Sequence, residues 1–276
     1  MPEIPGESDP DGWAPGPSCA ASDSAGPASA VPGVRLAVIE HESGTDARRF
    51  GHWLREAGAE LRVFRPYARA SEGQLPLPGE FDGLVVLGGS MGPADDAEHP
   101  WLPGTRELLR TSVGGQFPAL AICLGGELLA QATGGQIEQC ATAQIGLSTV
   151  RTRSEGSADP VFGGLPERFP AYLWHSLQMT LPPHAVHLVD GTGAPVQAFR
   201  LGEAWGTQFH PESTGEQLGA WGAAAGITHA PDGRTLDDVV VAATAAEPQV
   251  ASVMAPLAHR FVAYVRRFAA STAGPR

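Results

Sequence analysis

Short apolar runs alternate with amphipathic stretches along the first half of the chain. The apolar runs have strand length, and the stretches between them repeat apolar residues on one face of a helix. We predict strands over residues 34–39, 61–64, 81–87 and 119–122, and helices over residues 46–57 and 105–113. Alternating strands and helices indicate a parallel sheet covered by helices on both faces.

The pattern changes beyond Gly134. Strand-length apolar runs then follow one another with only turn residues between them, over residues 145–150, 172–174, 186–189, 196–199 and 204–209. This spacing predicts an antiparallel extension of the sheet. From about Glu216 the chain turns helical again, most clearly over residues 251–268, where Leu257, Phe261 and Val265 recur at helical spacing.

These patterns predict an α/β fold with a central, mostly parallel sheet, flanking helices and an antiparallel extension. Parallel sheets carry functional loops at the C-terminal ends of their strands, and Gly88, Gly89 and Cys123 fall at such ends. Residues 1–33 are rich in Pro, Gly, Ser and Ala and contain no Arg, which is typical of a disordered tail. We therefore assign the folded domain to residues 34–270.

The composition excludes several classes of protein. The net charge of −12 disfavours binding along a nucleic-acid backbone or an anionic membrane. No apolar run approaches the ~20 residues of a membrane span, and the N-terminus lacks the pattern of a signal peptide. All 18 basic residues are Arg, so catalysis by Lys is excluded. The three cysteines form no CxxC pair, so neither a metal site nor a disulfide framework is indicated, and a reduced, cytoplasmic setting is expected.

One cysteine stands where a strand meets a helix. The apolar run before Cys123 has strand length, Gly125 and Gly126 follow, and then comes an apolar, helix-forming stretch. This layout is typical of a nucleophile elbow, a sharp turn that lifts a reactive side chain above the sheet. The small glycines let the backbone fold tightly, and the start of the next helix favours a thiolate. We interpret Cys123 as the nucleophile of an acyl-transfer enzyme.

A thiolate nucleophile needs a group that takes and returns its proton. His210 follows the strand predicted over residues 204–209 and is itself followed by Pro211 and Glu212. A carboxylate two residues later can reach back to the imidazole and fix its tautomer. Cys123, His210 and Glu212 would then form a nucleophile, base and orienting group, the generalised triad.

Each of these residues also has a purely structural interpretation. A cysteine after an apolar strand is usually inert core when it stands alone, but the glycines and the His-Pro-Glu sequence reverse that preference for Cys123. His175 could be a second base, although a structural or substrate-contacting role is favoured. The remaining residues of these two types are interpreted as surface, packing or incidental: His41, His52, His99, His184, His187, His229, His259, Cys19 and Cys140.

A glycine-rich loop, Gly88-Gly89-Ser90-Met91-Gly92, follows the predicted strand over residues 81–87. Its backbone N–H groups can approach a ligand closely. We expect the N–H of Gly89 to stabilise a tetrahedral oxyanion together with the N–H of Leu124. The alternatives are a plain tight turn and a phosphate loop, and the second is disfavoured because no Gly-Lys-Ser/Thr follows.

Four segments together resemble the class I, or triad, glutamine amidotransferases. They are the glycine-rich loop, residues 121–130 around Cys123, the Trp174-His-Ser-Leu177 segment and the Trp205-Gly-Thr-Gln-Phe-His-Pro-Glu212 segment. The resemblance implies a flavodoxin-like fold over about residues 34–268. It also implies substrate contacts from Gly88, Gly89, Glu127, His175, Ser176 and Leu177, and no cofactor.

The resemblance implies a known reaction as well. The thiolate attacks the side-chain amide of glutamine, ammonia leaves after protonation by the histidine, and water clears a γ-glutamyl thioester. The ammonia usually passes to a synthetase domain or subunit. For this chain that implies a separate synthetase or acceptor partner, release of free ammonia, or another γ-glutamyl substrate.

The chain departs from the family pattern close to the nucleophile. Glu127 stands where the family usually has Gln, Gly126 replaces the common His or Ala, and Gln144 replaces a frequent Glu. A carboxylate at position 127 can accept from an α-ammonium but repels an α-carboxylate, and it should raise the pKa of Cys123. Three hypotheses follow: a glutamine amidotransferase or glutaminase, a hydrolase or acyl transferase for another γ-glutamyl or amide substrate in biosynthetic tailoring, and a non-catalytic regulatory homologue.

Overall fold

A nine-stranded sheet runs through the part of the chain that the computed structural model describes, residues 33–272. Its strand order is β2-β1-β3-β4-β9-β8-β7-β5-β6. The parallel half contains β2 (Ala59–Phe64), β1 (Val34–Ile39), β3 (Gly83–Val86), β4 (Ala119–Ile122) and β9 (Ala204–Thr207). The predicted parallel sheet is confirmed, and β4 lies between the strands that lead to the glycine-rich loop and to His210.

The other half of the sheet is antiparallel, as predicted. It contains β8 (Val196–Leu201), β7 (Val186–Asp190), β5 (Ile137–Thr152) and β6 (Arg168–Met179). The predicted strands at 145–150 and 172–174 were too short, because β5 has 16 residues and β6 has 12. Only four of the 16 residues of β5 are buried, so the sequence of β5 carries a weak apolar signal. The predicted strand at 204–209 was too long, since β9 ends at Thr207.

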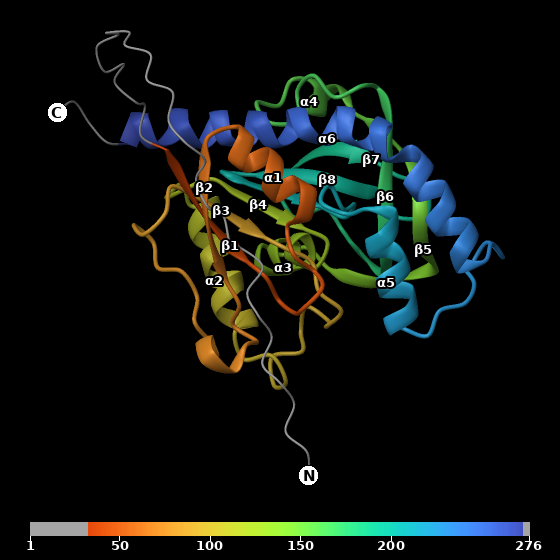
Figure 1. Cartoon of the computed structure of the whole chain (residues 1–276). Helices are drawn as coiled ribbons and strands as arrows, with labels where there is room; N and C mark the ends of the chain where they lie inside the picture. The colour runs from red at the N-terminus through yellow and green to blue at the C-terminus, as the bar shows by residue number, and fades with distance from the viewer. Residues whose placement is uncertain (1–32, 273–276) are drawn as a thin grey trace, which may run out of the picture. The chain divides into compact units, whose positions relative to one another are not determined.

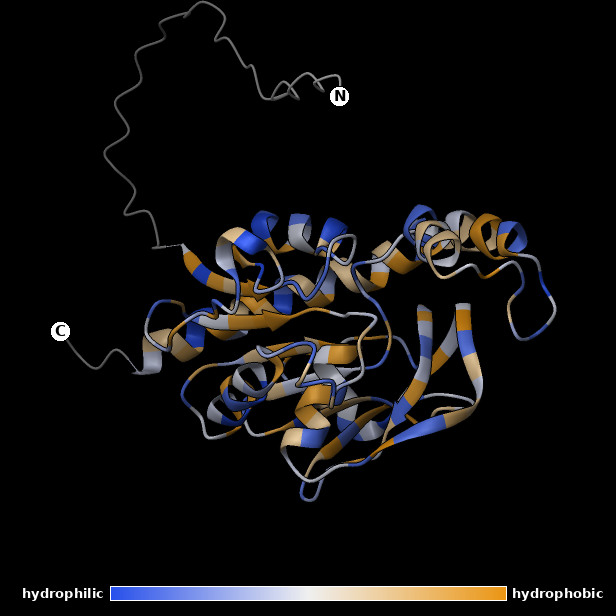
Figure 2. Cartoon of the chain, turned by 90° about the horizontal axis from the view of Figure 1, so that it is seen from below, coloured by the Kyte–Doolittle hydropathy of each residue, from blue (hydrophilic) through white to orange (hydrophobic). Residues whose placement is uncertain are grey.

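Helices cover the parallel half on both faces (Figure 1). One core cluster joins the sheet to α1 (Arg48–Glu56) and α6 (Leu236–Thr272), and the other joins it to α2 (Leu102–Val113) and α3 (Leu124–Ala132). Figure 2 shows hydrophobic residues concentrated on the strands between these layers, with hydrophilic residues on the outer sides of the helices. The remaining helical elements are η1 (Arg69–Ser71), α4 (Ser154–Ser157) and α5 (Gly215–Ala224).

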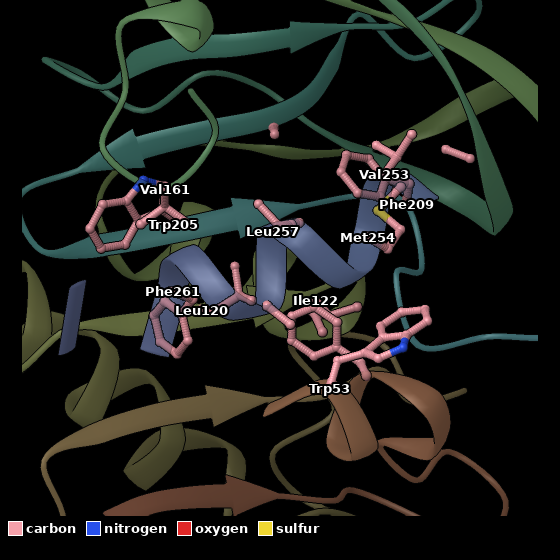
Figure 3. Close-up of a cluster of buried hydrophobic side chains, with 14 of the residues drawn as sticks. Trp53, Leu120, Ile122, Val161, Trp205, Phe209, Val253, Met254, Leu257 and Phe261 are labelled. Atoms are coloured by element: carbon pink, nitrogen blue, oxygen red, sulfur yellow. The ribbon is translucent and has the colours of Figure 1, made fainter. Parts of the chain in front are cut away.

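The final helix is longer than its apolar repeat predicted. We predicted helix over residues 251–268, but α6 begins at Leu236 and passes through Pro248 and Pro256. Tertiary packing overrides the helix-breaking tendency of proline here. The middle of α6 contributes Met254, Leu257 and Phe261 to the core cluster around Trp205 and Ile122 (Figure 3).

Helix α6 is also relevant to the prediction that no apolar run is long enough to span a membrane. Although no single apolar run has membrane length, α6 as a whole is long and apolar enough to cross a membrane by length and composition. A helix that forms part of a folded core passes the same test, and the buried residues of α6 belong to the core cluster that includes α1 and the sheet. Packing therefore accounts for the third of its most apolar stretch that is buried.

Two predictions concern the ends of the folded domain: a disordered tail over residues 1–33 and domain limits at residues 34 and 270. The predicted tail at residues 1–33 lies outside the described residues except for Gly33. The first described strand begins at Val34, where the domain was predicted to start. The tail and the domain limits of 34–270 stay predictions.

Replacing a core residue of α6 should cost far more stability than replacing a surface residue of the same helix. Phe261 is fully buried, whereas Val241 is 69% exposed. We expect Phe261→Ala to lower the free energy of unfolding by about 3–5 kcal/mol and Val241→Ala to change it by less than about 0.5 kcal/mol. Urea denaturation with equal slopes for both variants measures this difference. Equal denaturation midpoints for Phe261→Ala and Val241→Ala would show that the buried face of α6 does not stabilise the core.

Candidate active site

The backbone at Cys123 has the strained geometry of an elbow. Cys123 joins β4 to α3 with φ 50° and ψ −108°, a combination that side-chain-bearing residues rarely adopt. Such a conformation costs on the order of 1–3 kcal/mol and persists only where surrounding contacts fix it. Here the N–H of Cys123 donates to the carbonyl oxygen of Thr207 at 2.7 Å, and its own carbonyl accepts from the N–H of Glu127 at 2.9 Å.

The two glycines after Cys123 serve close packing. A Cβ at Gly125 would lie 2.5 Å from the carbonyl oxygen of Val86, and one at Gly126 would lie 2.6 Å from that of Thr207. Both distances are too short for any side chain. We expected these glycines to permit the tight turn, but the left-handed dihedral belongs to Cys123 itself. The glycines instead allow the first turn of α3 to rest on the backbones of β3 and β9.

His210 and Glu212 form a buried pair. The Nδ1 of His210 lies 2.7 Å from Glu212 Oε1, and the two side chains are 4% and 3% exposed. The N–H of His210 donates to the carbonyl oxygen of Tyr172 in β6, which fixes the backbone. A carboxylate acceptor places the proton on Nδ1 and leaves Nε2 as the working atom. Among the described residues 33–272, that Nε2 is buried without a hydrogen-bond partner.

Gly88 brings the thiol and the imidazole to one place. A Cβ at Gly88 would lie 3.2 Å from His210 Cε1 and 3.6 Å from Cys123 Cβ. Gly88, the first residue of the glycine-rich loop, therefore lies beside both groups. The substrate contact predicted for Gly88 stays a prediction.

The Cys123 and His210 side chains influence each other's protonation. Burial raises the pKa of Cys123, the charge of His210 opposes this, and Glu127 and Glu212 add to the increase. Burial alone would lower the pKa of His210, but the negative charges of Glu212 and of the Cys123 thiolate outweigh it and raise that pKa well above its usual range. Because the two groups interact, they titrate as a pair. This electrostatic coupling is what a thiolate with a histidine base requires.

Glu127 is buried beside the thiol. It accepts a hydrogen bond of 3.0 Å from Gln208 Nε2, and the same nitrogen lies 4.0 Å from Cys123 Sγ. Burial raises the pKa of Glu127, while the hydrogen bond from Gln208 and the charge of His210 act in the opposite direction. The expected increase in the pKa of Cys123 by Glu127 is thus present.

A cavity of about 260 Å³ opens next to Cys123 and Glu127. We call it the acyl-side pocket. The predicted residues Gly89, His175, Ser176 and Leu177 line it together with Glu127 and Cys123, so the structure brings all the predicted substrate contacts except Gly88 to one place. No Arg is among its lining residues.

His175 is not suited to be a second base. Its Nδ1 lies 2.7 Å from the carbonyl oxygen of Leu177 and 3.8 Å from Cys140 Sγ. Burial is the main cause that lowers the pKa of His175 to about 4, so the ring is neutral at neutral pH. The preferred interpretation, a structural or substrate-contacting residue, fits this environment.

The glycine-rich loop lies against the start of α3. A Cβ at Gly89 would lie 2.8 Å from Leu124 Cδ2. The N–H of Leu124 is among the first N–H groups of α3, which a helix leaves without internal partners. Next in the loop, the N–H of Ser90 donates to Glu42 Oε1 at 2.8 Å. The structure thus places Gly89 next to Leu124, and their role as an oxyanion site stays a prediction.

Sequence reasoning missed several neighbours of the triad. Gln208 could have been found from the sequence, because it lies in the Trp205–Glu212 segment that resembles the family, immediately before Phe209 and His210. Trp221 in α5 lies with its ring centroid 4.9 Å from that of His210 and carried no signal of its own. His41, interpreted as surface or packing, is fully buried and accepts a hydrogen bond from Trp101 Nε1, which identifies it as a packing residue. Within residues 33–272, no cluster of three or more His, Cys, Asp or Glu side chains could hold a metal ion.

Comparison with known proteins places the chain in a family. The family model for glutamine amidotransferase class-I matches residues 48–223, more than half of the chain and the part that includes Cys123, His210 and Glu212. A glutamine amidotransferase-like protein of Salmonella typhimurium, YfeJ, is 28% identical over 67% of this chain and 78% of its own length. The glutamine-hydrolysing GMP synthase of Thermus thermophilus is 40% identical over 58% of this chain but only 31% of the synthase.

Solved structures support the fold. A glutamine amidotransferase from Thermotoga maritima superposes with a TM-score of 0.71 at 24% identity, over 83% of this chain and 98% of its own. A second, from Methylobacillus flagellatus, has the same TM-score at 23% identity, over 86% and 96% of the two chains. These similarities confirm the predicted flavodoxin-like amidotransferase fold.

The negative charge of Glu127 should have a measurable effect on the pKa of the Cys123 thiol. Replacing Glu127 by Gln keeps an acceptor for Gln208 but removes a negative charge that disfavours the thiolate. We expect Glu127→Gln to lower the pKa of Cys123, so that alkylation by iodoacetamide begins at lower pH. Mass spectrometry of the Cys123 peptide across a pH series measures this change. The exposed Glu138→Gln variant is the matched control, and an equal profile in all three proteins would contradict the assigned effect.

Proposed function

The chain belongs to the class I glutamine amidotransferase family, and on that premise we propose that it hydrolyses the side-chain amide of glutamine through a thioester on Cys123. The ammonia then passes to a separate acceptor or synthetase partner. The observation that carries this proposal is the convergence of an elbow cysteine with a buried histidine whose Nδ1 is held by Glu212 and whose Nε2 is unpartnered.

In the proposed reaction His210 Nε2 takes the proton of the Cys123 thiol, and the thiolate attacks the γ-carbonyl carbon of the substrate. The N–H groups of Gly89 and Leu124 stabilise the resulting oxyanion. His210 Nε2 then gives its proton to the leaving nitrogen, and the C–N bond breaks. Water, deprotonated by the same Nε2, attacks the thioester carbonyl and releases glutamate and the thiol. Glu212 holds the imidazole in the tautomer that both steps need.

The proposal of a separate ammonia acceptor rests on the relatives of this chain. The Thermus relative is named as a glutamine-hydrolysing GMP synthase, and this chain matches only 31% of its length. A synthetase partner for this chain is therefore a proposal drawn by analogy. We also propose a reduced, cytoplasmic setting, because the thiol must remain unoxidised to react.

Glu127 favours a second candidate function, cleavage of a different γ-glutamyl amide. The acyl-side pocket holds a buried carboxylate and no Arg. Free glutamine brings an α-carboxylate that such a pocket repels, whereas an α-ammonium is attracted. A substrate whose carboxylate is absent, masked or directed elsewhere would fit better.

Loss of the thiol should abolish the reaction. We expect Cys123→Ala to reduce Cys-dependent release of glutamate from glutamine, or from another γ-glutamyl amide, by at least about 10³-fold. Cys140→Ala, which removes the other cysteine of the described structure, should remain within roughly tenfold of the native rate. A coupled glutamate dehydrogenase assay measures both. Equal activity in the native protein and in Cys123→Ala would disprove the proposed function.

The two candidate substrates can be separated at position 127. If the natural substrate is not free glutamine, Glu127→Gln should raise kcat/KM for glutamine by roughly tenfold or more, because a repulsion worth over ~1 kcal/mol is removed. Steady-state kinetics with glutamine test this. A native glutaminase activity that disappears in Glu127→Gln would instead eliminate the second candidate.

A further inference from the structure

A second cavity adjoins the acyl-side pocket at Cys123. It has a volume of about 290 Å³, and Cys123, His210, Trp174, Trp221, Glu42 and Thr45 are among its lining residues. We call it the His210-side pocket. Glu127 and His175 line only the acyl-side pocket, whereas His210 lines only this one. Gly89, Ser90, Cys123 and Trp174 belong to both.

The reaction assigns one part of the substrate to each pocket. The nitrogen that leaves must receive its proton from His210, so the leaving group lies on the His210 side. The acyl chain that stays on sulfur then occupies the pocket beside Glu127. A molecule the size of water or ammonia fills only about 30 Å³. The His210-side pocket therefore has room for many more atoms than an ammonia molecule.

The walls of the His210-side pocket are fixed by the chain itself. The ring centroids of Trp174 and Trp221 lie 5.9 Å apart. Trp221 Nε1 and Gln217 Nε2 each donate to the carbonyl oxygen of Gly44 at 3.0 Å. These bonds tie α5 to the loop after β1. Contacts within the chain thus hold Trp174 and Trp221, which both line the cavity, in place.

The polar part of this pocket is negative. Glu42 is held by Ser90, whose N–H and hydroxyl both donate to its carboxylate, and both residues line the pocket. Its lining contains no Arg. Trp174 and Trp221 line the same cavity as this carboxylate, and aromatic rings near a carboxylate form a typical environment for an organic ammonium group.

We infer that the amide cleaved here carries, on its leaving nitrogen, an alkyl chain that ends in an ammonium group, so that the leaving group is a diamine. This inference rests on the proposed Cys123-dependent cleavage of a γ-glutamyl-type amide. Cys123 Sγ bonds to the γ-carbonyl carbon, the C–N bond breaks, and His210 protonates the nitrogen of the departing diamine. Water then cleaves the thioester to give the carboxylate and the thiol. The second nitrogen stays protonated throughout, between Glu42 and the indole rings.

Three amides test this assignment in the full-length protein: glutamine, the γ-amide of glutamic acid with 1,4-diaminobutane, and the γ-n-pentylamide, which replaces the ammonium by a methyl group. We expect kcat/KM for the diaminobutane amide to exceed that for each of the others by at least tenfold. In Glu42→Gln, its advantage over the pentylamide should fall to within about threefold. This ratio cancels any general loss of activity. The exposed Glu56→Gln should keep the full advantage.

The outcomes separate the inference from the proposed function. Cys123-dependent cleavage in which glutamine or the pentylamide equals the diaminobutane amide overturns the inference and leaves the proposed function standing. An advantage that survives Glu42→Gln unchanged overturns it also. If no amide is cleaved, or if cleavage persists in Cys123→Ala, the proposed function and the inference both fail.

Discussion

The hydrogen bond from the N–H of Cys123 to the carbonyl oxygen of Thr207 is the constraint on which the site depends. At 2.7 Å it holds Cys123 at φ 50°, a conformation that costs on the order of 1–3 kcal/mol without such support. It also joins the end of β4 to the end of β9, three residues before His210. Because Gly126 has no side chain, α3 can pack directly on the same carbonyl. One contact thus sets the direction of the thiol and its position relative to the imidazole.

Two buried carboxylates act on this thiol in different ways. Glu212 orients His210 and holds its proton on Nδ1, and its charge is matched by that of the imidazole. Glu127 has only the amide of Gln208 as a hydrogen-bond partner and raises the pKa of Cys123. The family resemblance accounts for the first carboxylate and not for the second. In the proposed reaction Glu127 therefore influences which substrate is accepted, while Glu212 holds the imidazole for the proton transfers.

The sequence predicts the parallel half of the fold well, because buried parallel strands are continuous apolar runs. It also predicts which residues meet at the site, since Cys123, Gly89 and the His-Pro-Glu segment all follow strands that end at one edge. The length of β5 is not predictable in this way, because only four of its 16 residues are buried. The start of α6 is hidden by Pro248, whose local preference is overridden by packing. Trp221 and Glu42 reach the His210-side pocket only through tertiary contacts, so no local sequence pattern predicts their place in it.

The most direct measurement of the central claim is to capture the acyl-enzyme. The protein would be mixed with a γ-glutamyl amide, quenched in acid within the first turnovers, and digested for mass spectrometry. The account predicts a γ-glutamyl thioester on the peptide that contains Cys123. Amide cleavage without any adduct on Cys123, or with an adduct on another cysteine, would contradict it.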